Sequence, residues 1–156
     1  MPDATRVLIV DDHDVVRGGL RSLLDGEDTI EVVGEAADGN EAICKATSLQ
    51  PDVVLLDIVM PRCTGLDALV AIREKAPHAK VIIMSVSGEE KDMGKAFVSG
   101  ARGYLLKSSG INDIIGAIRK VMTGDIVFPP ELIGHFIARA KPVLSQILPK
   151  AGSCNL

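Results

Sequence analysis

The chain has 156 residues, of which 47% are hydrophobic, 24% are charged and 3% are aromatic, and its formal net charge is −4. This length and composition predict a globular chain with a core of aliphatic side chains, and they exclude a disordered protein. The negative charge also argues against a nucleic-acid binder, although a basic module outside this sequence could change that.

Membrane and secretion signals are missing from the sequence. No apolar run approaches the roughly 18 residues that a membrane-spanning helix needs, and the N-terminal stretch MPDATRVLIV lacks the pattern of a signal peptide. We therefore expect a cytoplasmic protein with no membrane partner. The three cysteines, Cys44, Cys63 and Cys154, have no paired or metal-binding spacing, which predicts reduced thiols.

Five short apolar runs predict strands, and the helical spacing between them predicts helices. The strands are expected at 6–10, 30–36, 52–57, 80–85 and 103–107. The helices are expected at 14–26, 40–49, 65–75, 88–99 and 111–123, with stop signals at Gly26, Gly100 and Gly124. Because the strands are continuously apolar, the sequence predicts a doubly wound α/β domain, in which helices cover both faces of a parallel sheet. The expected strand order is 2-1-3-4-5, the flavodoxin-like order.

The character of the chain changes after the fifth predicted helix. Pro129 and Pro130 suit a turn and a helix start, and Pro142 should end or kink the helix that follows. Apolar spacing predicts this helix through Leu132, Ile133, Phe136, Ile137 and Ala140. The stripe could pack on its own domain or on another chain. We predict a domain at 1–124 and a linker helix with a tail at 125–156.

Three acids follow two of the predicted strands. Asp11 and Asp12 come directly after the first strand, and Asp57 ends the third. Ligands of doubly wound sheets bind at the carboxyl ends of the strands where the winding direction reverses, so we expect these carboxylates to converge in one crevice. Their repulsion would be unfavourable without a cation. Mg²⁺ meets that need, because it accepts one or two carboxylates, several waters and a phosphoryl oxygen.

Donors for an anion follow the other two strands of this edge. Ser85 ends the fourth strand and Lys107 ends the fifth, so that a hydroxyl and an ammonium group are expected beside the acids. Acids, a divalent cation, a hydroxyl and a lysine together suit phosphoryl transfer, which depends on positioning and charge neutralisation. Asp57 is the predicted nucleophile, because an acyl phosphate on a carboxylate needs no additional base.

The sequence resembles the receiver domain of two-component response regulators over about residues 5–123, in the stretches VDDH, LLDIVMP…TG, IIMS and GYLLK. The resemblance implies that Asp57 is the phosphoacceptor. It also implies that Asp12, with Asp11, Asp57 and the backbone carbonyl of Val59, holds Mg²⁺. A sensor histidine kinase is the partner that such a domain implies.

The resemblance gives three further residues a role. It implies that Ser85 hydrogen-bonds the phosphoryl group, that Lys107 pairs with it, and that Tyr104 is an aromatic rotamer switch that follows Ser85. Apart from its own phosphorylation and dephosphorylation, such a domain is not an enzyme. Whether phosphorylation promotes a homodimer is open.

The stretches DDHDVVRGGLRSLL, VGEAADGNEA and GARGYLLK further resemble the NarL/FixJ (LuxR-like) transcriptional subfamily. Its pattern usually continues into a helix-turn-helix, but too few residues remain after Lys141 for a complete DNA-binding domain. DNA is therefore an expected partner only through a domain that is absent from this chain. The alternatives are a stand-alone receiver that acts by protein–protein interaction or phosphorelay, and a small hydrolase or phosphatase.

Some positions depart from the family pattern or allow a simpler interpretation. Ser108 follows Lys107 where many receivers have proline, so a cis peptide bond is not assured there. Val86 is bulkier than usual and is expected to slow entry of a phosphodonor or of water. His13 is given no role, because a polar loop histidine is usually solvated, and Asp14 is the favoured N-cap of the first helix.

Overall fold

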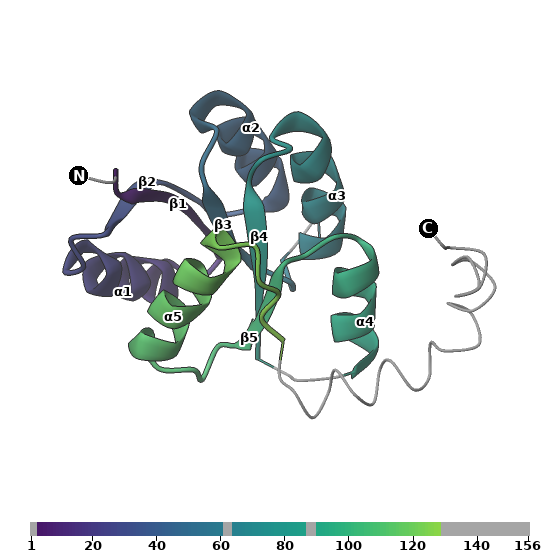
Figure 1. The fold of residues 1–156 in the computed structure, drawn as a ribbon. Helices are drawn as coiled ribbons and strands as arrows, with labels where there is room; N and C mark the ends of the chain where they lie inside the picture. The colour runs from purple at the N-terminus through teal and green to yellow at the C-terminus, as the bar shows by residue number, and fades with distance from the viewer. Residues whose placement is uncertain (1–2, 61–63, 87–89, 129–156) are drawn as a thin grey trace, which may run out of the picture.

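The computed structural model describes residues 3–60, 64–86 and 90–128. Strands and helices alternate throughout these residues (Figure 1). The strands are β1 (Thr5–Val10), β2 (Ile30–Ala36), β3 (Val53–Asp57), β4 (Lys80–Ser85) and β5 (Gly103–Leu106). The helices are α1 (Asp14–Asp25), α2 (Gly39–Leu49), α3 (Gly65–Lys75), α4 (Glu90–Val98) and α5 (Ile111–Met122). The helix predicted through Leu132 and Ala140 lies outside the described residues, as do Cys63 and Cys154.

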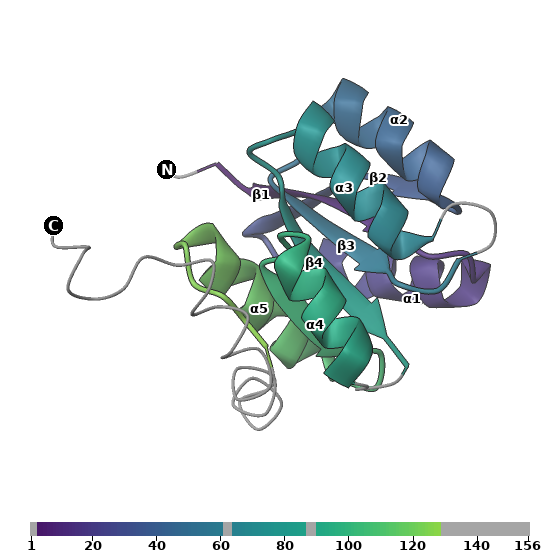
Figure 2. The same cartoon turned by 90° about the vertical axis from the view of Figure 1, so that its right-hand side faces the viewer.

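The strands form one parallel sheet in the order β2-β1-β3-β4-β5, which confirms the predicted flavodoxin-like fold. Helices α1 and α5 cover one face, and α2, α3 and α4 cover the other (Figures 1 and 2). The order reverses between β1 and β3, which pair directly, for example through Val10 and Leu56. The carboxyl ends of these two strands therefore lie side by side.

The core consists of two apolar layers, one on each side of the sheet. Neighbouring residues of a strand point to opposite faces, so Leu55 belongs to the layer under α1 and α5, and Leu56 to the layer under α2, α3 and α4. Both side chains are at most 1% exposed. Burial on both faces explains why the strands read as continuous apolar runs rather than as alternating ones.

Helix ends follow the local chemistry of the chain. Asp38 caps α2 by accepting a hydrogen bond from the Glu41 amide at 2.8 Å. Gly100 and Gly124 adopt positive φ angles of 100° and 93° after α4 and α5, as helix stop signals do. The predicted N-cap Asp14 is wrong. His13 occupies that position, while Asp14 is the first residue of α1 and its carboxylate pairs with Arg17 at 2.7 Å.

The peptide-bond geometry and the length of the helices can be compared with the expectations from the sequence across the described residues. Its peptide bonds are all trans, including the bond between Lys107 and Ser108. Within the same ranges, no helix has both the length and the apolar character that crossing a bilayer would require.

Candidate functional site

The predicted acids meet at the carboxyl edge of the sheet. Asp11 follows β1 directly and Asp57 ends β3, so the pairing of these strands places the two side chains at the same edge. Asp11, Asp12, Asp57 and His13 each offer one ligand atom, and these atoms lie within 4.8 Å of one another. Asp11 is 5% exposed and Asp57 is 2% exposed. The expected convergence of three carboxylates is therefore present.

Lys107 joins two of these acids. Its ammonium nitrogen lies 2.8 Å from Oδ2 of Asp11 and 2.9 Å from Oδ2 of Asp57. The end of β5 brings it there, because the Lys107 amide donates to the carbonyl oxygen of Ser85 at 2.6 Å. The buried acids thus share one cation from the protein itself, which offsets part of their repulsion.

The two buried acids differ in electrostatic environment. Burial, together with repulsion from Asp11, raises the pKa of the Asp57 carboxyl above its ordinary value, although Lys107 and the Val59 amide oppose this. Burial would raise the pKa of Asp11 as well, but hydrogen bonds from Lys107 and the His13 amide hold it below its ordinary value. Burial disfavours the charged form of Lys107, yet its two carboxylate partners raise its pKa overall, so the lysine stays cationic.

Asp12 provides the unsatisfied oxygen of the cluster. Its Oδ1 atom is buried and has no hydrogen-bond partner within the described ranges. His13 Nδ1 lies 3.1 Å from it, but the pair does not have hydrogen-bond geometry. A buried carboxylate oxygen without a donor is costly, and a hard cation with oxygen ligands would satisfy it. The donor set of Asp11, Asp12 and Asp57 therefore fits Mg²⁺.

The chain bends at Ile58, directly after Asp57. The Val59 amide donates to Oδ1 of Asp57 at 3.1 Å, which fixes the carboxylate and keeps the backbone of Val59 beside it. Val59 itself is an exposed side chain. Its predicted contribution is the backbone carbonyl, for which an apolar, solvent-facing side chain is no obstacle.

His13 is a site residue that the sequence analysis did not assign. Its Nδ1 atom lies 3.1 Å from Oδ1 of Asp11 and equally far from Oδ1 of Asp12, at the exposed rim of the cluster. The backbone amide of His13 also donates to Asp11 at 2.8 Å. Its place directly after two acids was the available signal, but a loop histidine carries little weight in a sequence by itself.

Ser85 and Tyr104 share one face of the sheet. Ile83 pairs with Tyr104 and Ser85 pairs with Leu106, so the serine and the tyrosine lie diagonally across the two neighbouring strands. Both are buried, and Tyr104 is 0% exposed. Val86, the residue directly after Ser85, is in contrast 78% exposed.

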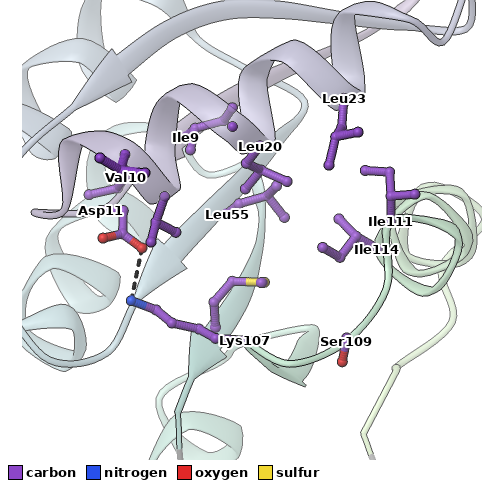
Figure 3. A pocket seen from close by; sticks show the side chains of 14 residues that line it. Ile9, Val10, Asp11, Leu20, Leu23, Leu55, Lys107, Ser109, Ile111 and Ile114 are labelled. Atoms are coloured by element: carbon purple, nitrogen blue, oxygen red, sulfur yellow. Dashed lines mark ion pairs between the residues drawn. The ribbon is translucent and has the colours of Figure 1, made fainter.

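An apolar cleft of about 250 Å³ lies between α1 and α5, next to the acids. Figure 3 shows Leu20 and Leu23 of α1 facing Ile111 and Ile114 of α5 across it, with the ion pair of Asp11 and Lys107 at one end. Lys107 therefore borders both the acidic site and this cleft.

Comparison with known proteins agrees with this geometry. Residues 7–119 match the family model described as the response regulator receiver domain. The chain belongs to this family of phosphoacceptor domains, which act in two-component systems. It is 42% identical to the response regulator protein VraR of Staphylococcus epidermidis over 138 aligned residues, and these make up 88% of this chain. The chain spans about two thirds (66%) of the length of that relative.

Two solved structures are similar to the chain over most of their own length. A DNA-binding response regulator of the LuxR family from Staphylococcus aureus has 32% identity and a TM-score of 0.71, over 75% of this chain and 98% of that one. A chain of the CheX–CheY–BeF₃–Mg²⁺ complex from Borrelia burgdorferi has 30% identity and a TM-score of 0.72, over 77% of this chain and 90% of that one. The Asp cluster described above is consistent with a receiver Mg²⁺ site.

Proposed function

We propose that this chain accepts a phosphoryl group on Asp57 from a sensor histidine kinase and passes the signal to a transcriptional output. The observation that carries the proposal is the cluster of Asp11, Asp12 and Asp57, in which Lys107 bridges the two buried acids, Asp11 and Asp57. The similarity to VraR and to a LuxR-family regulator supports a DNA-binding output, through a domain outside this sequence.

Each residue of the cluster has a part in the transfer. Asp11, Asp12, Asp57 and the carbonyl of Val59 would hold Mg²⁺, which supplies positive charge for the oxygens of the phosphoryl group. The Asp57 carboxylate attacks the phosphorus of a phosphohistidine, forming the new P–O bond as the P–N bond breaks and the imidazole leaves. The contact with Val59 keeps the attacking carboxylate in place.

Lys107 and Ser85 respond to the product. The phosphoryl group on Asp57 brings nearly two negative charges, so the Lys107 ammonium exchanges its contact with the Asp57 carboxylate for one with a phosphoryl oxygen. Ser85 donates its hydroxyl to another oxygen of the same group, and Tyr104 moves toward the space beside Ser85. These contacts differ between the two conformations of the domain, so phosphorylation shifts the equilibrium between them and changes the face formed by α4, β5 and α5. The chain turns over no external substrate.

The test is labelling by phosphorus-32 acetyl phosphate with and without Mg²⁺. The wild-type chain should incorporate close to one phosphoryl group, in a bond that resists acid and is cleaved by base, and Asp57→Asn should incorporate none. Asp52→Asn is the matched control, because Asp52 lies at the opposite end of β3, where it accepts a hydrogen bond from the Arg6 amide. Base-labile label that persists on Asp57→Asn would contradict the assignment of Asp57 as the phosphoacceptor.

A further inference from the structure

The segment after α5 lies along the free edge of the sheet. Strand β5 is the last in the sheet order, so its outer edge has no partner among β1 to β4. Val127 fills that edge, because its amide donates to the Arg102 carbonyl and its carbonyl accepts from the Tyr104 amide, both at 2.8 Å. We call Asp125 to Phe128 the strap. Figure 1 shows this part of the chain running back along the sheet after α5.

A single aromatic side chain anchors the strap. Phe128 is 7% exposed, and its ring stacks on Tyr104 with centroids 6.0 Å apart and planes 25° apart. It also meets Phe97 of α4 edge to face at 5.6 Å. The chain has only three phenylalanines and one tyrosine, so a meeting of three of these rings at one point is a specific feature of the fold.

Phe128 and Ser85 lie on opposite sides of Tyr104. Strand β4, which carries Ser85, pairs with one edge of β5, and the strap pairs with the other. The tyrosine ring therefore has the phosphoryl-binding serine on its inner side and the strap on its outer side. A movement of the ring toward Ser85 is a movement away from Phe128.

The strap depends on that ring contact. Two backbone hydrogen bonds at a solvent-facing edge are marginal by themselves, so apolar packing supplies most of the attachment. Phe128 is the buried residue of the strap, and Val127 packs in part against the core layer under α1 and α5. Withdrawing Tyr104 would leave a void beside Phe128, and a void in a packed core is costly unless the neighbouring groups shift. Either the phenylalanine follows the tyrosine or the strap loosens.

We propose that Phe128 couples Tyr104 to the strap, so that phosphorylation of Asp57 loosens the strap by drawing Tyr104 toward Ser85. This inference rests on the proposed function. Coupling is reciprocal, so a chain whose strap is already loose should favour the phosphorylated state. Phe128 is a positioning residue, because it acts through Tyr104 and does not touch the site itself.

The experiment compares Phe128→Ala and Phe128→Leu with the wild-type chain, using Mg²⁺ and beryllofluoride as a stand-in for the phosphoryl group. Tyr104 is the single tyrosine and the chain has no tryptophan, so intrinsic fluorescence reports this ring alone. Amide hydrogen exchange at Val127 reports the strap. Ile126→Ala is the matched control, since Ile126 is the neighbouring strap residue and is 48% exposed.

Phe128→Ala should bind beryllofluoride about 5-fold or more tightly than the wild-type chain. Phe128→Leu should fall between the two, and Ile126→Ala should match the wild type. In the wild type, beryllofluoride should change the fluorescence of Tyr104 and accelerate exchange at Val127. In Phe128→Ala, exchange should be fast already and should not respond to the ligand.

Two negative results are distinguishable. If the wild type binds beryllofluoride but both Phe128 variants bind it equally well, and exchange at Val127 ignores the ligand, the coupling is refuted while the proposed function stands. If the wild type itself binds no beryllofluoride in the presence of Mg²⁺, the proposed function fails and the coupling fails with it. Phe128→Leu retains an apolar side chain, so it decides the matter even if Phe128→Ala does not fold.

Discussion

At the scale of single residues, the site places one positively charged lysine beside three carboxylates. Lys107 satisfies one oxygen each of Asp11 and Asp57, while the buried Oδ1 of Asp12 has no hydrogen-bond partner in the described part of the chain. The cluster is thus incompletely neutralised by the protein itself. A group of acids that is unfavourable for folding but ready for a cation is what a binding site for Mg²⁺ requires.

Replacing Asp12 by Asn should separate stability from binding. Removing one charge relieves repulsion, so the free energy of unfolding without Mg²⁺ should rise by about 1 kcal/mol. The affinity for Mg²⁺ should fall about 10-fold or more, because a charged ligand is lost. Urea unfolding and calorimetric titration with Mg²⁺ measure the two effects. The control Asp28→Asn changes an exposed acid in the loop before β2 and should alter neither; unchanged Mg²⁺ affinity in Asp12→Asn would contradict the assignment.

The sequence predicted most of the residues at this edge, because strand ends can be read from apolar runs and parallel strands align their ends. Asp11, Asp57 and Lys107 followed from that rule alone. Their partners did not, since the bridge from Lys107 to two acids depends on side-chain packing that no periodicity encodes. His13 was missed for the same reason. A loop residue acquires its place only when the ends of β1 and β3 are brought together.

At the scale of elements, the start of α3 is packed against the end of β3, the strand that carries the proposed phosphoacceptor Asp57. The Gly65 amide donates to the Ile58 carbonyl at 3.1 Å. A Cβ atom at Gly65 would lie 2.3 Å from the Asp57 carbonyl oxygen and 2.6 Å from the Ile58 Cα atom. These are backbone atoms, so no side-chain rotation can make room, and only glycine allows this approach.

Gly65→Ala should therefore destabilise the domain although alanine is the better helix former. We expect the free energy of unfolding to fall by about 3 kcal/mol, as for overpacking in a core, and labelling of the displaced Asp57 to slow. Gly116→Ala is the matched control, because a Cβ at that position in α5 meets nothing within 4 Å. The control should be stabilised by roughly 0.5–1 kcal/mol. Urea unfolding compares them; equal stabilisation of both variants would refute the packing argument.

The bounds of helices and strands were predicted well where burial of apolar residues determines them. They were predicted less well where a local side-chain or backbone contact determines them. The strands, to within about one residue at each end, and the 65–75 helix followed from apolar spacing, and the stops after α4 and α5 followed from Gly100 and Gly124. The start of α1 did not, because Asp14 turned toward Arg17 instead of capping the helix. The strap was also unforeseen. Its residues Ile126, Val127 and Phe128 stand before two prolines and read as the start of a linker, and pairing with β5 depends on an edge that only the assembled sheet creates.

At the scale of the whole molecule, charged hydrogen bonds join the helix layer to the sheet. Glu35 at the end of β2 accepts hydrogen bonds from Arg17 Nε at 3.0 Å and from Arg21 Nη1 at 2.6 Å, so both arginines of α1 hold that helix to the sheet. Arg17 also donates to the Asp11 carbonyl at 2.6 Å. The same network therefore fixes α1 against β2 and fixes the backbone at the entrance to the acidic site.

This network predicts how the stability of the whole domain depends on pH. The hydrogen bond from Arg21, aided by Arg17, holds the pKa of Glu35 below its ordinary value, against the opposing effect of burial. Its stabilisation is therefore fully present above pH 4.5, the ordinary pKa, and is lost as the pH falls through the lower pKa of the folded state. Glu35→Gln should unfold more easily than the wild type by roughly 1 kcal/mol at neutral pH, and the difference should shrink in acid. Urea unfolding of both proteins across this range measures it. Glu31→Gln, an exposed acid on the same strand, should show no such convergence, and a difference for Glu35→Gln that is constant with pH would contradict the charged network.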